Sequence, residues 1–396
     1  MAGKITTKHP RVALFFQNDI PLERAKMKGI MQYLRRRPQW DIPLIGRRPG
    51  VTYEQLREWR GDGVIGNIPP EVSVDALQKR GVKIVNTASP RENNPRIHIV
   101  SVDSAKIGFL AAEHLLQRKF HRFAFAGTAA NEEGKPLHFQ KRQKGFMDTI
   151  RSYGFPCREF WVTSPCVEDF LESEMWLPYI KTLTLPVAIF ACSDYVGYGI
   201  LRACRELELR VPEELAVLGV DNDDILCQLA IPRLSSIDPN GEKVGYLAAA
   251  TLDRLMQGDT HVPPLQYVAP QGIRMWTSTN IFASSDLEVT EAIRFIHSHA
   301  QDPITVKEVM RIATVSRRTL ERRFRELMSQ SIAEYLRNTR LDMVMELLAD
   351  HHRPIEEIAR RCGFDNAPRL NTAFRKKYGC TAAAYRDRLD AKPNVD

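Results

Sequence analysis

Two basic stretches near the carboxyl end of the chain have the side chains that suit chemistry with a polyanion. Between Ser316 and Met328 there are five arginines and two glutamates, and from Arg369 to Lys377 there are four basic residues and no acid. An arginine fork can bond guanine O6 and N7 together, and lysine neutralises phosphates. A single basic helix is more often a solvated surface, but two in the same setting favour double-stranded DNA as the partner.

Each basic stretch is predicted to be the second helix of a helix-turn-helix unit. In the first unit Thr305-Val-Lys-Glu308 is a capping box. Leu320, Phe324 and Leu327 then form an apolar stripe that leaves the arginines outside the core. The second unit repeats this layout, with Gly363 ending its first helix. The helices predicted for this region are Leu287–Ala300, Val306–Ile312, Arg317–Met328, Ile332–Ala349, Ile355–Cys362, Ala367–Tyr378 and Ala382–Leu389.

A second group of polar side chains follows predicted strands earlier in the chain. Asn18 comes after one strand, and Ser193 with Asp194 after another. Asp221 ends a third. Polar groups at the carboxyl ends of parallel strands face a common cleft, where carboxylates and amides accept hydrogen bonds from sugar hydroxyls. Each has a plainer interpretation, because an aspartate at a strand end often caps the next helix, and Arg142 would suit a solvated helix start.

The elements that position these side chains alternate between strand and helix, a pattern that predicts parallel sheets with helices on their faces. The predicted strands are Val12–Phe16, Gly63–Ile65, Val82–Asn86, Phe123–Ala126, Val187–Ala191 and Ala216–Val220. The predicted helices are Leu22–Arg36, Ala105–Gln117, Arg142–Tyr153, Tyr195–Leu207 and Glu242–Met256. We therefore expect an α/β domain of two lobes at residues 1–275, a polar linker at 276–285, an all-α domain with two helix-turn-helix units at 286–390, and a tail at 391–396.

Composition excludes several classes of protein. The chain has 396 residues, of which 43% are hydrophobic and 26% charged, which is typical of a globular protein with more than one domain. No apolar run approaches the ~18 residues of a membrane span. The seven cysteines include no Cys-x-x-Cys pair, so we expect a reduced, cytoplasmic protein without a metal site. The net charge of +8 is compatible with a DNA partner but does not require one.

The helical region resembles the DNA-binding domain of AraC-type transcription regulators. The resemblance rests on Ile358-Ala-x-x-Cys-Gly-Phe364, on Phe374-Arg-Lys-Lys-Tyr-Gly379 and on Ser316-Arg-Arg-Thr-Leu-x-Arg-x-Phe324. The chain departs from the usual pattern at Ala382, where proline is common, and at Leu370, where an aromatic is common. By motif position the resemblance implies DNA contacts from Arg317, Arg318, Glu321 and Arg322 in the first unit and from Pro368, Arg369, Asn371 and Thr372 in the second.

The α/β region resembles the LacI-type effector domain, which has the fold of periplasmic binding proteins. The matching residues are Val102-Asp103 with Gly108, Arg142-x-x-Gly-Phe146, and the stretch from Pro186 through Asp194 and Val211-Pro212 to Asn222. The resemblance implies a sugar cleft with Arg142, Ser193, Asp194 and Asp221 among its lining residues. It also suggests Asn18, and Trp176 as a possible stacking wall.

Together the two resemblances imply a sugar-responsive transcription regulator, with D-xylose or a related monosaccharide as effector. They further imply a homodimer and activation by contact with RNA polymerase, while repression and another sugar remain alternatives. An enzyme acting on a glycosidic bond through paired carboxylates is a second class, but no nucleophile–base motif accompanies Asp194 and Asp221. A transport-type binding protein is a third class, which the basic helical region disfavours.

Overall fold

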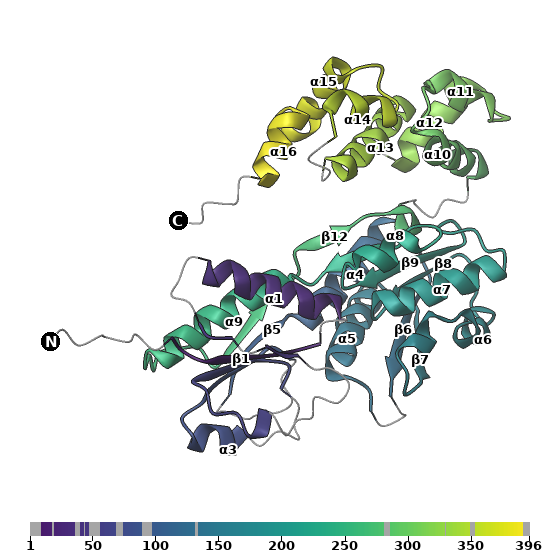
Figure 1. The fold of residues 1–396 in the computed structure, drawn as a ribbon. Helices are drawn as coiled ribbons and strands as arrows, with labels where there is room; N and C mark the ends of the chain where they lie inside the picture. The colour runs from purple at the N-terminus through teal and green to yellow at the C-terminus, as the bar shows by residue number, and fades with distance from the viewer. Residues whose placement is uncertain are drawn as a thin grey trace. The chain divides into compact units, whose positions relative to one another are not determined.

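The computed structural model describes residues 9–17, 20–35, 40–42, 44–46, 56–68, 74–88, 97–130, 134–280, 286–328, 330–348 and 353–390. The chain divides into two compact units, Met1–Ile281 and Phe282–Asp396. Each unit is described separately below (Figure 1). Within the described residues, no helix is long and apolar enough to cross a membrane.

The first unit contains two six-stranded sheets; the sequence pattern predicted parallel sheets but only six of these twelve strands, namely β1, β3, β4, β6, β8 and β9. The first sheet is parallel throughout and has the order β11-β5-β4-β3-β1-β2. The second has the order β12-β10-β9-β8-β6-β7, and only its edge strand β12 is antiparallel. The strands are β1 Val12–Phe16, β2 Leu44–Gly46, β3 Gly63–Gly66, β4 Lys83–Asn86, β5 His98–Val102, β6 Phe123–Ala129, β7 Cys157–Thr163, β8 Val187–Ala191, β9 Leu215–Val220, β10 Ser235–Asp238, β11 Leu265–Val268 and β12 Gly272–Arg274.

Helices cover the sheets and connect the two lobes. The chain leaves the first sheet after β5, enters the second at β6, returns to the first at β11 and ends in the second at β12. Helix α1 packs beside α9, as Figure 1 shows, and α4 packs on α5. The helices of this unit are α1 Pro21–Leu34, α3 Val74–Lys79, α4 Ser104–Gln117, α5 Leu137–Ser152, α6 Leu177–Ile180, α7 Asp194–Glu206, α8 Asp224–Leu229 and α9 Gly241–Met256, with short 3-10 turns at Glu168–Leu171, Ser173–Met175 and Thr277–Thr279.

The contact between α4 and α5 is close enough to require glycine. A Cβ atom at Gly108 would lie 2.1 Å from the backbone oxygen of Arg142. Because no real side chain fits at that distance, the main chains of the two helices lie directly against each other. This contact holds the amino-terminal half of α5, which carries Arg142, against α4.

The segment after β12 is fastened to the second sheet rather than forming the polar linker predicted from residue 276. Ser278 and Thr279 are fully buried. The Ser278 hydroxyl donates to the Val217 carbonyl (2.6 Å) and accepts from the Ser235 amide (2.8 Å). His114 at the end of α4 bonds the Thr279 hydroxyl at 3.0 Å. Residues 276–280 therefore belong to the effector unit, and residues 281–285 lie outside the described part.

The second unit is all-α, as predicted, and its helices match the predicted ranges within a few residues. They are α10 Leu287–His299, α11 Val306–Arg311, α12 Arg317–Met328, α13 Ile332–Leu347, α14 Ile355–Arg361, α15 Ala367–Tyr378 and α16 Ala382–Asp390. Leu320 and Phe324 of α12 and Leu370 and Phe374 of α15 are fully buried, as predicted, whereas Leu327, the third member of the first stripe, is only partly buried. The helix α13 joins the two helix-turn-helix units and packs against α11, α12, α14 and α15.

Side-chain caps begin several of these helices and explain their boundaries. The predicted capping box at the start of α11 is present, with Thr305 bonding the helix amides and Glu308 bonding back to Thr305. Asn366 caps α15 by accepting from the Arg369 amide at 3.0 Å. Gly379 ends α15 at φ +75°, a conformation that favours glycine. All seven cysteines are free thiols.

Candidate effector cavity and nucleic-acid interface

A cavity of about 430 Å³ lies in the first unit and receives side chains from both lobes. The first lobe contributes Glu23 and Lys26 from α1, Asn67 after β3 and Thr87 after β4; the second contributes His138, Phe139 and Arg142 from α5, Phe170, and Ser193, Asp194 and Asp221 after β8 and β9. These polar groups follow the carboxyl ends of parallel strands, where ligands bind in such folds. The volume lies in the range of small-molecule sites.

Arg142 and Asp221 form the charged centre of the second lobe's wall. The Arg142 side chain is buried, donates to the Cys192 carbonyl and contacts Asp221 through Nη2 at 3.3 Å from Oδ1. Its Nε atom is buried and has no hydrogen-bond partner within the described residues. An unpartnered buried donor carries a desolvation cost that a ligand oxygen would remove. Arg142 lines the cavity, and only two of its five N–H groups donate within the described residues, so it can also bind a ligand oxygen.

The Asp221 carboxyl is the acidic group best placed to reach a ligand. Its side chain is 19% exposed. Burial raises the pKa of Asp221, and the charge and hydrogen bond of Arg142 oppose that rise. Asp221 and Asn222 both have positive φ, +111° and +51°, which side chains other than glycine rarely adopt. Strained backbone of this kind is concentrated at ligand sites.

Ser193 and Asp194 border the cavity but serve mainly to build it. The Ser193 hydroxyl caps α7 by accepting from the Val196 amide. Asp194 is 1% exposed and accepts from the Asp223 amide at 2.8 Å and from the Ser236 hydroxyl at 2.7 Å. Burial, followed by repulsion from Asp221, raises the pKa of Asp194 well above its usual value. Its carboxyl oxygens are thus occupied inside the lobe, where they hold the loop that presents Asp221.

Two predicted residues remain, Asn18 and Trp176. Asn18 lies outside the described residues. Trp176 is fully buried and donates its indole N–H to the Phe170 carbonyl at 2.9 Å. The proposed stacking wall is therefore corrected: Trp176 packs behind Phe170, and the aromatic side chains that line the cavity are Phe139, Phe170 and Tyr195.

The polar residues of α1 were not predicted to belong to the site. Glu23 and Lys26 are each only 4% exposed. Lys26 donates to the Thr87 carbonyl at 3.0 Å, and Glu23 accepts from the side-chain Nδ2 of Asn67 at 3.2 Å. Burial lowers the pKa of Lys26, against the opposing charges of Glu23 and Asp221. In a sequence, an acid and a base three residues apart at a helix start usually indicate a solvated ion pair. Their burial in the cavity wall becomes visible only in the folded chain, where Thr87 and Asn67 contact them.

His138 supplies a pH dependence. Burial, followed by repulsion from Arg142 and Lys26, lowers the pKa of His138 to about 3. The unfolded chain takes up this proton near pH ~6.5. Because the unfolded chain binds this proton at a higher pH than the folded chain does, the free energy of unfolding decreases as the pH falls below ~6.5 toward 3. The decrease is at most about 1.4 kcal/mol at pH ~5.5. We expect His138→Gln to flatten the fall in unfolding free energy between pH ~7.5 and ~5.5. Exposed His121→Gln is the control, and equal slopes in both variants would contradict the assignment.

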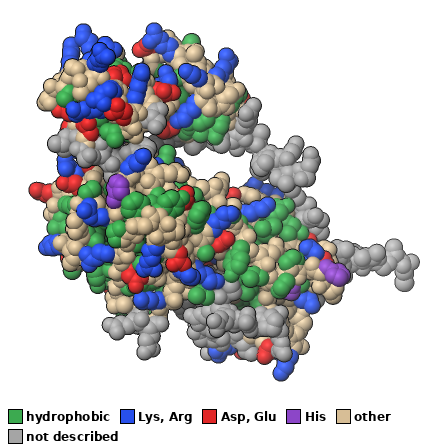
Figure 2. Space-filling model, turned by 180° about the vertical axis from the view of Figure 1, so that it is seen from behind, with side chains coloured by type: hydrophobic (Ala, Val, Ile, Leu, Met, Phe, Trp, Pro, Cys, Tyr) green, Lys and Arg blue, Asp and Glu red, His purple; other side chains and the backbone are tan. Residues whose placement is uncertain are grey.

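The helix α12 presents its arginines on the surface, as predicted. Figure 2 shows separate Lys and Arg side chains on this unit's surface, interspersed with acidic and hydrophobic ones. Arg317 and Arg318 are exposed and form no ion pair with any described residue. Arg322 pairs with Glu326 one turn on at 2.7 Å, a surface pair of ~0–1 kcal/mol that a phosphate or base can replace. Glu321 is less accessible, with 23% of its side chain exposed beside Arg325.

In α15, the structure separates the predicted DNA contacts into two groups. Pro368, Arg369 and Thr372 are exposed along one side, and Arg369 pairs with Asp365. Asn371 instead accepts from the buried Ala382 amide at 3.1 Å, at the start of α16. Its amide oxygen is therefore occupied by the protein fold. The prediction that Asn371 faces a DNA groove is corrected on this ground.

We expect Asn371→Ala to lower stability and Arg369→Ala to weaken DNA binding. Removing the Asn371 amide leaves the Ala382 N–H buried without a partner, which should lower the unfolding free energy of this unit by about 1–3 kcal/mol. Base preference should stay the same. Arg369→Ala should leave stability nearly unchanged and weaken binding at a preferred DNA site by ~1–3 kcal/mol. Selection of binding sites from randomised duplexes, together with urea unfolding, measures both; a changed base preference in Asn371→Ala would return this residue to the interface.

Comparisons with known proteins agree with both units. Residues 112–275 match the model of a periplasmic binding protein-like domain, and residues 309–388 match that of a helix-turn-helix domain. The fold and these two matches define a transcription regulator in which a periplasmic binding protein-like effector domain precedes a helix-turn-helix DNA-binding domain.

Within that class, the chain is similar over nearly its whole length to xylose operon regulatory proteins. It is 28% identical to that of Escherichia coli (strain K12) over 388 residues, covering 96% of this chain and 98% of the relative. It is 25% identical to that of Haemophilus influenzae over 390 residues, covering 96% and 99%. Among solved structures, it matches the xylose-binding transcription activator XylR with a TM-score of 0.70 and 26% identity, covering 96% of this chain and 99% of that one. These relatives are regulators, not enzymes.

Proposed function

We propose that this protein is a D-xylose-responsive transcription activator of sugar-catabolic genes that works in the cytoplasm. The observation that carries the proposal is the cavity that Arg142 and Asp221 line side by side, in a chain that also carries two helix-turn-helix units. A sugar ring offers hydroxyls that both donate to Asp221 and accept from Arg142. The similarity to xylose operon regulatory proteins supports xylose as the sugar and activation as the sense of regulation.

The proposed mechanism is a shift between two arrangements of the lobes. A sugar that touches Lys26 or Asn67 on one lobe and Arg142 or Asp221 on the other favours the arrangement in which both contacts form. It changes DNA binding only as far as its affinity differs between the two arrangements. Regulation by another monosaccharide, or repression, would use the same cavity and is the alternative.

Homodimerisation and contact with RNA polymerase are part of the proposal. Three aliphatic side chains at and after α8 support a second copy as partner, because Ile225, Leu229 and Ile231 are each more than 60% exposed. A contiguous exposed apolar patch is a feature of protein–protein interfaces. Sedimentation velocity of the full chain, with and without sugar, tests the oligomeric state.

The proposal is tested by thermal unfolding of the full chain against a panel of monosaccharides that includes D-xylose. A ligand that binds only the folded protein raises stability by RT ln(1 + [L]/Kd). We expect a selective shift with D-xylose, followed by a change in affinity for a DNA duplex when xylose is added. A shift with another sugar would replace xylose as effector, and no shift with any sugar would refute a monosaccharide effector.

A further inference from the structure

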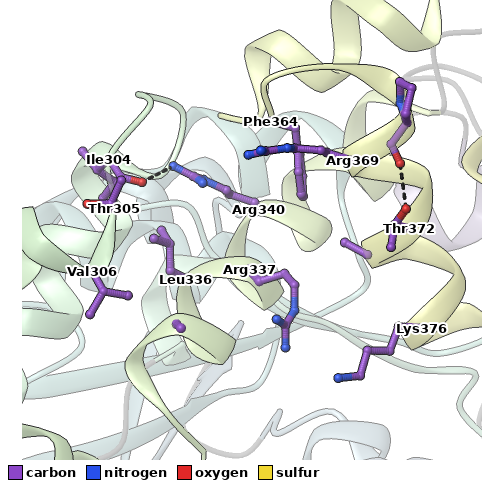
Figure 3. Close-up of a pocket in the computed structure, with 13 residues that line it drawn as sticks. Ile304, Thr305, Val306, Leu336, Arg337, Arg340, Phe364, Arg369, Thr372 and Lys376 are labelled. Atoms are coloured by element: carbon purple, nitrogen blue, oxygen red, sulfur yellow. Dashed lines mark hydrogen bonds between the residues drawn. The ribbon is translucent and has the colours of Figure 1, made fainter.

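A groove of about 630 Å³ lies in the DNA-binding unit, next to the residues predicted to read bases. It lies between the linking helix α13, one side of α15 and the turn that precedes α11 (Figure 3). Val306, Leu336 and Phe364 give it an apolar floor. In Figure 3, Arg337 and Lys376 extend toward the same part of the groove from α13 and α15.

The charge of this groove has one sign. Of the thirteen described residues that line it, four are bases and none is an acid. Arg340 is occupied, because it donates to the carbonyls of Ala300, Asp302 and Ile304 at 2.8–2.9 Å. Lys376 has no polar partner within the described residues. Arg337 has only Glu334 on its own helix at 3.8 Å, a distance at which a surface pair contributes little. Two cations are thus available to an anionic ligand.

The groove adjoins the side of α15 that is predicted to read bases. Pro368, Arg369, Thr372 and Lys376 lie at positions i, i+1, i+4 and i+8 of that helix, so they share one face, and all four line the groove. If this face of α15 lies in a major groove, the DNA strand that borders that groove runs beside α13. That strand presents phosphates and the apolar faces of deoxyribose rings. A cationic rim over an apolar floor is complementary to this combination.

We propose that this groove binds the DNA sugar–phosphate backbone between the two major grooves that α12 and α15 enter, with Arg337 and Lys376 on phosphates and Leu336 and Val306 against deoxyribose. The proposal rests on the DNA-binding part of the proposed function. It assigns a direct share of DNA affinity to α13, the helix that joins the two helix-turn-helix units and packs against both. Because backbone contacts read no bases, the groove would add affinity without adding base preference.

The test uses the full chain, a fluorescent duplex of arbitrary sequence, and anisotropy titrations at several KCl concentrations. The slope of log K against log [KCl] reports the number of phosphates contacted, at about 0.9 per phosphate. We expect Arg337→Gln and Lys376→Gln each to reduce the slope by ~0.9 and the double variant by twice that. Sites selected from randomised duplexes should be the same as for the wild type.

The matched control is Arg294→Gln. Arg294 also pairs with an acid three residues earlier, Glu291, at similar exposure, but lies on α10 outside the groove. It removes the same charge and should leave the slope within error of the wild type. If the wild type binds and the groove variants keep its slope, or if Arg294→Gln lowers the slope equally, the groove proposal is wrong. If the wild type binds no duplex, the DNA-binding function itself is refuted.

Discussion

Replacing Asp221 with asparagine is expected to abolish the sugar response while leaving DNA binding by the sugar-free protein nearly unchanged. The Asp221 carboxylate is partly exposed in the cavity and is oriented by Arg142. An amide removes the charge and turns one acceptor into a donor, so bonds to the sugar hydroxyls are lost. Hydrogen bonds to charged groups contribute ~1.5–3 kcal/mol, so we expect affinity to fall by roughly 10- to 150-fold for each bond that is lost. Isothermal titration with D-xylose measures the loss.

The control for this prediction is Asp194→Asn, which changes the neighbouring acid in the same way. Asp194 bonds the Asp223 amide and the Ser236 hydroxyl inside the lobe. Its loss should lower the unfolding temperature more than Asp221→Asn does, and lower sugar affinity less. Sugar binding by Asp221→Asn at wild-type strength would place the ligand's acceptor elsewhere in the cavity.

Replacing Arg340 with methionine is expected to destabilise the DNA-binding unit by about 3 kcal/mol. Its guanidinium donates hydrogen bonds to three backbone carbonyls in the turn between α10 and α11. Methionine has no N–H group, so these three bonds are lost. Because Arg340 lies on α13, its loss also removes the hydrogen bonds between this turn and the linking helix. We therefore expect DNA affinity to fall as well.

This prediction can be measured selectively, since all five tryptophans lie in the effector unit. Urea unfolding followed by tryptophan fluorescence should stay unchanged, whereas the circular dichroism of the helices should show an earlier transition. Arg337→Met, one turn earlier on α13 and without carbonyl bonds, is the matched control. Equal stability of the two variants would mean that the turn is held by other contacts.

The helical unit was largely predictable because its signals are local. Apolar stripes at helical spacing fixed α12 and α15 to the residue, and Thr305 with Glu308 marked the start of α11. Gly363 was expected as a helix end, at φ +70° in the structure. The structure adds a second reason for glycine, because a Cβ there would lie 2.5 Å from the Ala300 carbonyl oxygen and 2.6 Å from Arg340.

What was missed depends on partners distant in sequence. Strand β10 begins with Ser235 and Ser236, which are polar and yet fully buried, because their hydroxyls bond Trp276 and Asp194. No local pattern shows such pairing. For the same reason Lys26 was not chosen as a cavity residue and Asn371 was assigned to DNA, since their bonds to Thr87 and Ala382 form only in the folded chain.

The fastening of residues 276–280 determines where this regulator can be cut and rejoined. Ser278 bonds both β9 and the first residue of β10, so a chimera that replaces the chain from residue 276 onward would remove part of the effector domain's own core. A junction within residues 281–285 would keep residues 276–280, and therefore the core of the effector domain, in the chimera. Engineered biosensors that pair this cavity with a different DNA-binding module should therefore be spliced after Asn280.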